Sequence, residues 1–183
     1  MNIIRNSILS GIFISLAGLC NLILGGVLGA FLFSAGLMGI ISTGSFLYTG
    51  RIYVERNYLD LGKIIIGNII GCCIGGLLSR YSYPDIVSTA STIITARCED
   101  TIVAIIWKSI GCGTLMTAAV LGMKENNPWP LLLGIPLFVL TGLYHSIADG
   151  FYFFVSPNLN YIPVWIMIVI GNLIGGKLGW IKK

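Results

Sequence analysis

Six long apolar runs divide this chain of 183 residues, and they constrain its fold more than any other feature. A helix needs roughly 20 residues to cross about 30 Å of hydrocarbon, so runs of this length are typical of membrane-spanning segments. Charge, proline or polar clusters separate the runs, except that only Gly25 and Gly26 divide the first two. The sequence therefore predicts a single domain, 1–183, with transmembrane helices at 7–25, 27–50, 61–80, 102–123, 129–154 and 161–181.

The composition also indicates a lipid environment, because 56% of the residues are hydrophobic and only 10% are charged. So few charges could not cover the surface of a soluble domain of this size. No cleavable signal peptide is evident, since a second apolar run follows the first almost at once. The sequence shows no zinc-type cysteine spacing, nucleophile elbow or phosphate loop, so we expect neither an enzyme nor a cofactor.

The distribution of basic residues predicts the orientation. With both termini in the cytoplasm, the outer loops hold only Arg80 and Arg97. The inner segments then hold Arg5, Arg51, Arg56, Lys63, Lys124, Lys177, Lys182 and Lys183. This asymmetry follows the positive-inside rule and explains the net charge of +4 without a nucleic-acid partner. We expect a multi-pass protein of the cell (inner) membrane with both termini cytoplasmic.

Three motifs occur twice in the same order, about a hundred residues apart. The pairs are SILSG from Ser7 and SIGCG from Ser109, TGSFLYTG from Thr43 and TGLYHSIADG from Thr141, and GNIIGCCIGG from Gly67 and GNLIGGKLGW from Gly171. Each half holds three spans, an odd number, so the second half must enter the membrane from the opposite side. The pattern predicts a 3+3 inverted repeat, which is characteristic of channels and transporters. Chance matches in glycine-rich sequence are the alternative.

The repeated motifs indicate two kinds of contact. In spans two and five the Thr-Gly pairs lie in mid-run, where glycine weakens a helix, so we expect two half-helices joined by a non-helical break in each. Half-helix N-termini that face a cavity favour anions. A continuous kinked helix is the alternative. In spans three and six small residues let helices approach closely and asparagines can hydrogen-bond across the contact. These packing residues are Gly67, Asn68, Gly71, Gly171, Asn172 and Gly175.

The chain resembles the formate/nitrite transporter family, pentameric channel-like proteins with an aquaporin-like six-helix protomer. The match lies in TGSFLYTG, WKSIGCG, GLYHSIADGFYFF and the paired GNIIG and GNLIGG motifs, and it covers nearly the whole chain. The resemblance implies a homopentamer in the lipid bilayer that passes small monovalent anions such as formate, nitrite, lactate or hydrosulfide, or their conjugate acids. It also implies that His145 is the central pore histidine, Thr49 the threonine of the span-two break and Lys108 the basic residue of span four.

Four positions depart from the family pattern. Phe46 and Tyr144 stand where glutamates are usual, and Gly113 and Asp149 stand where asparagines are usual. These departures bear on substrate choice more than on fold. The loss of both glutamates suggests an alternative function as a pore for small neutral solutes. The short chain suggests another, a membrane scaffold subunit that does not conduct.

His145 is the most deeply placed ionisable group, and such groups are costly to bury in a membrane and normally face a polar interior. Its ordinary pKa near ~6.5 lets it donate or accept a proton at physiological pH. We expect Lys108 to gather an anion, an apolar neck to exclude the charged form, and a proton from or near His145 to let the neutral acid pass. A lysine that only extends to the membrane surface is the alternative for Lys108. A purely structural histidine is the alternative. Asp149 could pair with His145 if the helix were continuous. The remaining residues expected at the pore are Phe46, Leu47, Phe138 and Tyr144.

Overall fold

The computed structural model describes residues 2–178, and the regular elements of this range are all helices. They are α1 (Ile3–Leu24), α2 (Gly26–Thr43), α3 (Tyr48–Arg51), α4 (Tyr58–Ser82), α5 (Ile86–Glu99), α6 (Ile102–Lys124), α7 (Trp129–Leu140), α8 (Ser146–Val155) and α9 (Tyr161–Leu178). The end of the sixth predicted span, together with Lys182 and Lys183, lies outside the described residues.

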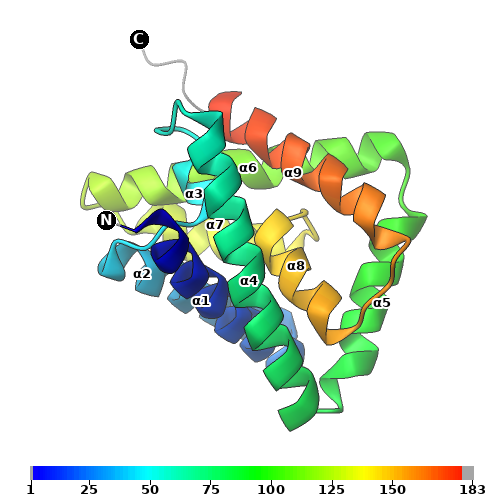
Figure 1. The fold of residues 1–183 in the computed structure, drawn as a ribbon. Coiled ribbons are helices and arrows are strands. Elements are labelled where there is room, and N and C mark those ends of the chain that lie inside the picture. Colours follow the sequence, from blue (N-terminus) through cyan, green and yellow to red (C-terminus); the bar gives the residue numbers. More distant parts are fainter. Residues whose placement is uncertain (1, 179–183) are drawn as a thin grey trace.

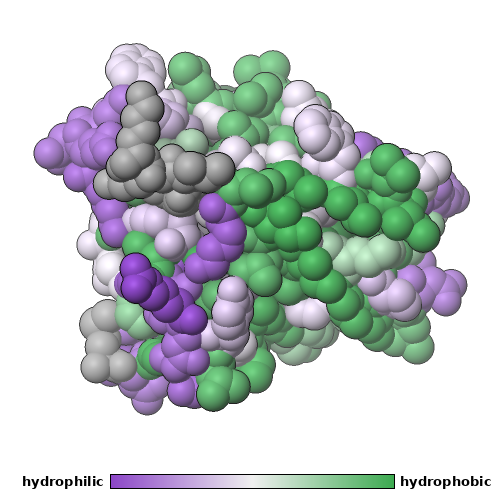
Figure 2. Space-filling model, turned by 90° about the horizontal axis from the view of Figure 1, so that it is seen from above, coloured by the Kyte–Doolittle hydropathy of each residue, from purple (hydrophilic) through white to green (hydrophobic). Residues whose placement is uncertain are grey.

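Five of these helices, α1, α2, α4, α6 and α9, are long and apolar enough to cross a membrane. Large apolar side chains on them are exposed; Leu59, Val103 and Trp107 keep 76%, 78% and 72% of their surface accessible. Figure 2 shows a broad hydrophobic area across one face of the molecule, with hydrophilic residues at its two ends. Exposed apolar area on this scale requires a lipid or protein partner. The expected all-helical membrane class is confirmed.

Two helix pairs form the framework, α1 with α4 and α6 with α9, and Figure 1 shows α1 running beside α4. Their backbones touch at glycines. Gly11 of α1 faces the backbone of Asn68 and Gly71 on α4, and Gly113 of α6 faces the backbone of Asn172 on α9. A Cβ atom at either glycine would overlap those backbone atoms. Such approach is possible only for residues without a side chain.

The chain leaves the helical conformation at 44–47, between α2 and α3, and at 141–145, between α7 and α8. Gly44 and Gly142 both have φ +66°. This left-handed conformation is strained for other residues and commonly ends a helix. Both interruptions fall within the Thr-Gly motifs, and they bring α3 and α8 into the interior of the helix bundle.

The residues between the predicted spans 61–80 and 102–123, assigned to an outer loop, contain α5. Ile86, Ala90 and Ile94 recur every four residues, so they line one face of a helix, and all three are buried. The other faces are polar, which is why the segment does not stand out as an apolar run. In Figure 1, α5 flanks the bundle on the side of α8 and α9, and it packs against both. This helix brings Arg97 to the site described next.

Candidate functional site

Asn172 of α9 fixes the interruption before α8 through its side-chain amide. Its Oδ1 accepts a hydrogen bond from the Ser146 N–H at 2.9 Å, and its Nδ2 donates to the carbonyl oxygens of Tyr144 and Ser109, each at 2.8 Å. The residue is fully buried. Main-chain groups that have lost their helical partners are thereby satisfied, and the turn is tied to α6.

Asn68 of α4 does the same for the interruption before α3. Its Oδ1 accepts from the Tyr48 N–H at 2.9 Å, and its Nδ2 donates to the carbonyl oxygens of Phe46 and Ser7, each at 2.8 Å. The two asparagines therefore bind equivalent main-chain groups in the two halves. We call Asn68 and Asn172 the two asparagine clamps.

His145 caps α8 and is buried, with 1% of its surface exposed. Its Nδ1 accepts the Ala148 N–H at 3.0 Å, and its Nε2 lies 3.0 Å from Thr49 Oγ1. A neutral imidazole has one donor and one acceptor nitrogen. Because Nδ1 is the acceptor, the proton of a neutral ring is on Nε2, which donates to Thr49. The ring is stacked on Phe138, with centroids 5.7 Å apart.

His145 lines one cavity of about 210 Å³, and Gly50, the chain neighbour of Thr49, lines a second cavity of the same volume. We name them after one lining residue. The Arg51 cavity includes Ile40, Ile41, Gly44, Ser45, Leu47, Gly50, Arg51 and Val54 in its wall. The His145 cavity includes Phe138, Val139, Gly142, Leu143, His145, Ala148, Asp149 and Tyr152. Taken in order, these residues form pairs separated by 98 positions, so the two cavities have equivalent walls.

Asp149 lies in the wall of the His145 cavity and is paired with Arg97 of α5. Arg97 Nε donates to Asp149 Oδ1 at 3.0 Å, and the carboxylate is 1% exposed. Burial lowers the pKa of Arg97, but the adjacent charge of Asp149 and their hydrogen bond raise it further, so the guanidinium remains charged. Asp149 thus bonds to Arg97 rather than to His145, with which the sequence suggested a pair.

Lys108 of α6 is also paired with a carboxylate. Its Nζ lies 2.6 Å from Asp100 Oδ2, and the Tyr144 hydroxyl donates to the same oxygen. The hydrogen bond from Lys108, followed by that from Tyr144, lowers the pKa of Asp100. Two cations lie over the Tyr144 ring: Arg97 Cζ is 4.7 Å and Lys108 Nζ is 4.9 Å from the ring centroid. The predicted anion-gathering lysine therefore does not act as an isolated charge.

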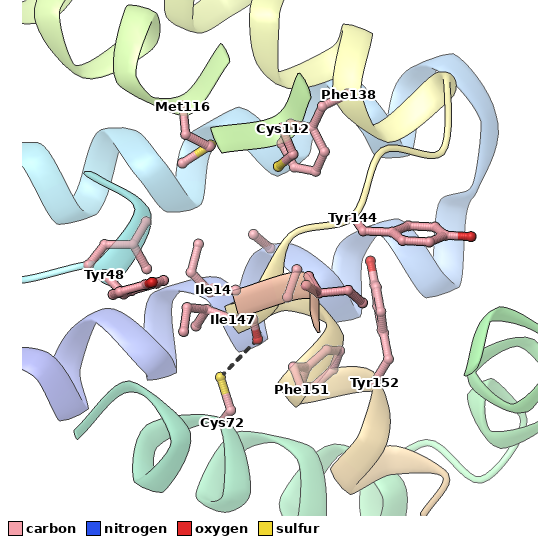
Figure 3. Close-up of a cluster of buried hydrophobic side chains, with 14 of the residues drawn as sticks. Ile14, Tyr48, Cys72, Cys112, Met116, Phe138, Tyr144, Ile147, Phe151 and Tyr152 are labelled. Carbon is pink, nitrogen blue, oxygen red and sulfur yellow. Dashed lines mark hydrogen bonds between the residues drawn. The ribbon is translucent and has the colours of Figure 1, made fainter. Parts of the chain in front are cut away.

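The remaining residues singled out in the sequence lie near the two interruptions and at the helix contacts. Figure 3 shows Tyr48 and Tyr144 on opposite sides of the buried cluster, with Ile147 between them and the Tyr144 hydroxyl pointing away. Phe46 is not in either cavity wall; its ring lies 4.0 Å from Arg51 Cζ. Lys177, one of the basic residues assigned to the inner side, donates to the Glu55 carbonyl oxygen at 2.8 Å. Gly67, Gly71, Gly171 and Gly175 lie at the α1–α4 and α6–α9 contacts.

Sequence reasoning missed Arg97 and Asp100 as site residues. Both lie in the segment interpreted as an outer loop, where charges are usually solvated. A helical periodicity test on 86–99 could have found α5, but nothing local to the sequence indicates that Arg97 meets a carboxylate 52 positions away. Within residues 2–178, no three His, Cys, Asp or Glu side chains lie together as metal ligands would.

The comparisons with known proteins agree with this architecture. A family model for formate/nitrite transporters matches residues 1–180. No curated protein matches the chain in sequence. Among solved structures, one described as a pentameric formate channel with formate bound is similar with a TM-score of 0.83 at 19% identity, covering 96% of this chain and 92% of that one. An FNT family ion channel gives a TM-score of 0.87 at 17% identity, covering 96% and 86%.

These matches define the class as an integral, multi-pass membrane transport protein rather than an enzyme. The chain belongs to the formate/nitrite transporter family, as its motifs indicated.

Proposed function

We propose that this protein is a channel for small monovalent anions and their neutral conjugate acids, of the formate, nitrite, lactate and hydrosulfide class. The observation that carries the proposal is the buried Thr49–His145 pair between two cavities with equivalent walls. Family membership and a similar structure that holds formate support the substrate class. The path runs from one cavity past this pair to the other.

The path crosses a protomer built as an inverted repeat. In this proposal α2 with α3, and α7 with α8, are each one broken span, so that the chain crosses the membrane six times. Support comes from the 98-residue spacing of the cavity walls and from the matching bonds of the asparagine clamps. Non-helical backbone is tolerated at membrane depth only where protein buries it or a cavity adjoins it. Both conditions hold at 44–47 and 141–145.

The Thr49–His145 pair complements a neutral acid better than an anion. A protonated carboxylic or nitrous acid offers one acceptor and one donor oxygen. His145 Nε2–H can donate to the first, and Thr49 Oγ1 can accept from the second. A bare anion has no proton to offer Thr49, and its charge is costly to desolvate beside apolar groups such as Leu47 and Phe138. In this mechanism the anion is protonated in a cavity, and the Thr49–His145 pair then binds the resulting neutral acid.

We further propose five copies in a ring, each with its own path, because a similar solved structure is described as pentameric. The exposed apolar surface of α1, α2, α4, α6 and α9 would then be shared between lipid and neighbouring protomers. The predicted orientation, with both termini cytoplasmic in the inner membrane, directs the Arg51 cavity inward and the His145 cavity outward. Native mass spectrometry tests the assembly, and a stable monomer would contradict it.

Flux into proteoliposomes tests the function. We would measure formate, nitrite, lactate, hydrosulfide and glycerol at about pH 5.5 and about pH 7.5. The fraction of neutral acid differs about a hundredfold between these values for formate, nitrite and lactate, and by less for hydrosulfide. The acids should pass faster at the lower pH and glycerol should not pass. Thr49→Val, similar in shape but without the hydroxyl, should lose about tenfold or more of this flux, whereas Thr49→Ser should keep it.

Two other outcomes would overturn the proposal. Glycerol flux with no acid flux would indicate a pore for neutral solutes. No flux of any solute by a protein that is correctly assembled would indicate a non-conducting scaffold.

A further inference from the structure

The Arg51 cavity has a basic wall with no acidic counterpart. Arg51 and Lys124 both line it, and no Asp or Glu does. Among the residues that the structure describes, neither cation takes part in an ion pair. Arg51 Cζ lies 4.0 Å from the Phe46 ring centroid, and Lys124 Nζ lies 5.0 Å from that of Tyr53. An aromatic face orients a cation without neutralising its charge.

The equivalent position on the other side carries the opposite charge. Arg51 corresponds to Asp149 at the 98-residue spacing. The His145 cavity is lined by Arg97 and Asp149, which are paired with each other. Lys108, which bonds the hydroxyl of Tyr144 next to the wall residues Leu143 and His145, is paired with Asp100. Charges are therefore balanced on one side and unbalanced on the other.

We propose that the Arg51 cavity is a binding site for one small planar oxyanion, a carboxylate or nitrite, with Arg51 as its main ligand and Lys124 as a second charge. This deepens the proposed function and rests on it, because the bound ion would be the substrate before it reaches Thr49 and His145. A guanidinium presents parallel N–H donors that match two oxygens of one anion, which a spherical ion such as chloride cannot use. The His145 cavity provides no such site.

The dimensions and remaining wall agree with an ion of this size. A cavity of about 210 Å³ holds an anion of three heavy atoms with some water, since a water molecule occupies about 30 Å³ of liquid. Ser45 adds a hydroxyl to the wall, while Leu37, Ile40 and Leu47 make the rest apolar. The low-dielectric wall strengthens the attraction of the two cations.

Binding of ¹³C-formate to the purified protein tests this without requiring flux. Line broadening of the formate signal would be titrated at constant ionic strength, with chloride replacing formate. Arg51→Gln should weaken formate binding about tenfold or more. The matched control is Arg56→Gln, which removes the same charge from an exposed residue of the same connection and should bind as the wild type does.

Arg51→Lys keeps the positive charge but removes the paired N–H donors of the guanidinium. It also tests the site if Arg51→Gln fails to fold. It should lose several-fold in formate affinity while competition by chloride is unchanged. Wild-type formate affinity in Arg51→Gln or Arg51→Lys, or an equal loss in Arg56→Gln, would overturn the site. Specific binding without flux would leave the site standing and refute the channel. Formate flux by a protein whose Arg51 variants bind formate as the wild type does would support the channel and refute the Arg51 site.

Discussion

The two interruptions of this molecule share a scaffold and differ in chemistry. At 44–47 and 141–145 a left-handed glycine ends a helix, and an asparagine clamp binds three main-chain groups in the same geometry. The side chains at equivalent positions are different: Leu47 corresponds to His145, and Arg51 to Asp149. The comparison indicates that the same backbone arrangement carries side chains of different polarity and charge at the two interruptions.

Replacement of either clamp should have the largest effect. Asn68→Ala and Asn172→Ala each leave one N–H and one carbonyl of an interruption unpaired, at about 1–3 kcal/mol per group, and each also removes a bond to a carbonyl inside α1 or α6. We expect both to lower the thermal unfolding midpoint in detergent by roughly 6–12 °C or to prevent assembly. Asn160→Ala, at an exposed asparagine, is the control. If the scaffolds are equivalent, the two losses should be similar; a large loss in only one would show that the halves are held differently.

Changing His145 should affect flux strongly and separate chemistry from fold. His145→Asn keeps an oxygen that can cap α8 through the Ala148 N–H, but it is too short to reach Thr49. We expect a stable protein whose acid-stimulated formate flux falls about 10–100-fold in proteoliposomes. His145→Leu, which copies Leu47, should lose the cap as well and be less stable. Wild-type flux in His145→Asn at every pH tested would leave the histidine as a structural residue.

Asp149→Asn makes the two cavities more alike in charge. The amide oxygen can still accept from Arg97, so the fold should persist, but the guanidinium is no longer neutralised. We expect the half-saturating external formate concentration to fall roughly 3–10-fold in initial-rate measurements on oriented vesicles. Arg97→Gln combined with Asp149→Asn should return it to the wild-type value. An unchanged value in the single variant would show that the pair does not control anion access.

The Lys108–Asp100 pair should have a smaller effect, because it is partly exposed and screened by solvent. Lys108→Met leaves Asp100 unpaired and should raise the external half-saturating concentration about 2–3-fold, whereas Asp100→Asn should lower it by a similar factor. The same initial-rate assay measures both. Changes in the same direction would contradict a charge effect.

The stability contributed by Asp100 should also have a defined pH dependence. Its pKa is lowered in the folded protein from an ordinary value of 3.8. The stabilisation is therefore fully present above that ordinary value and is lost only as the pH falls through the lower, folded value. The difference in unfolding midpoint between wild type and Asp100→Asn should stay constant from about pH 7 to about pH 5. A difference that disappears within this interval would show that the carboxylate is not held by Lys108 and Tyr144.

Much of the fold could be predicted from the sequence, because the length of an apolar run and the position of a glycine within it are visible in a short stretch of residues. The runs at 7–25 and 61–80 correspond to α1 and α4, and the Thr-Gly motifs contain the non-helical residues 44–47 and 141–145. The family was also recognised correctly from these motifs. Helix α5 was not predicted, because only one of its faces is apolar and it forms no continuous apolar run.

Less of the site could be predicted, because its bonds join residues distant in sequence. The motif at Asn172 suggested a bond between helices, which its bond to Ser109 of α6 provides, but nothing indicated its bonds to Tyr144 and Ser146, which lie 28 and 26 positions away. Asp149 was considered only with its near neighbour His145, whereas its partner is Arg97. Such pairings depend on how helices are arranged, which no spacing along the chain determines.

The asparagine clamps bind main-chain atoms and make no hydrogen bond to the side chains at 46, 47, 144 and 145. A change of side chain at 46, 47 or 144 therefore leaves the clamp bonds intact, whereas a change at 145 also affects the cap that His145 provides to the Ala148 N–H. The clamp bonds are thus compatible with Phe46 and Tyr144 at the two positions where the family resemblance implies glutamate. In the proposed channel, the side chains at 46, 47 and 144 are therefore the first to alter in order to change which solute passes while both clamps keep their bonds.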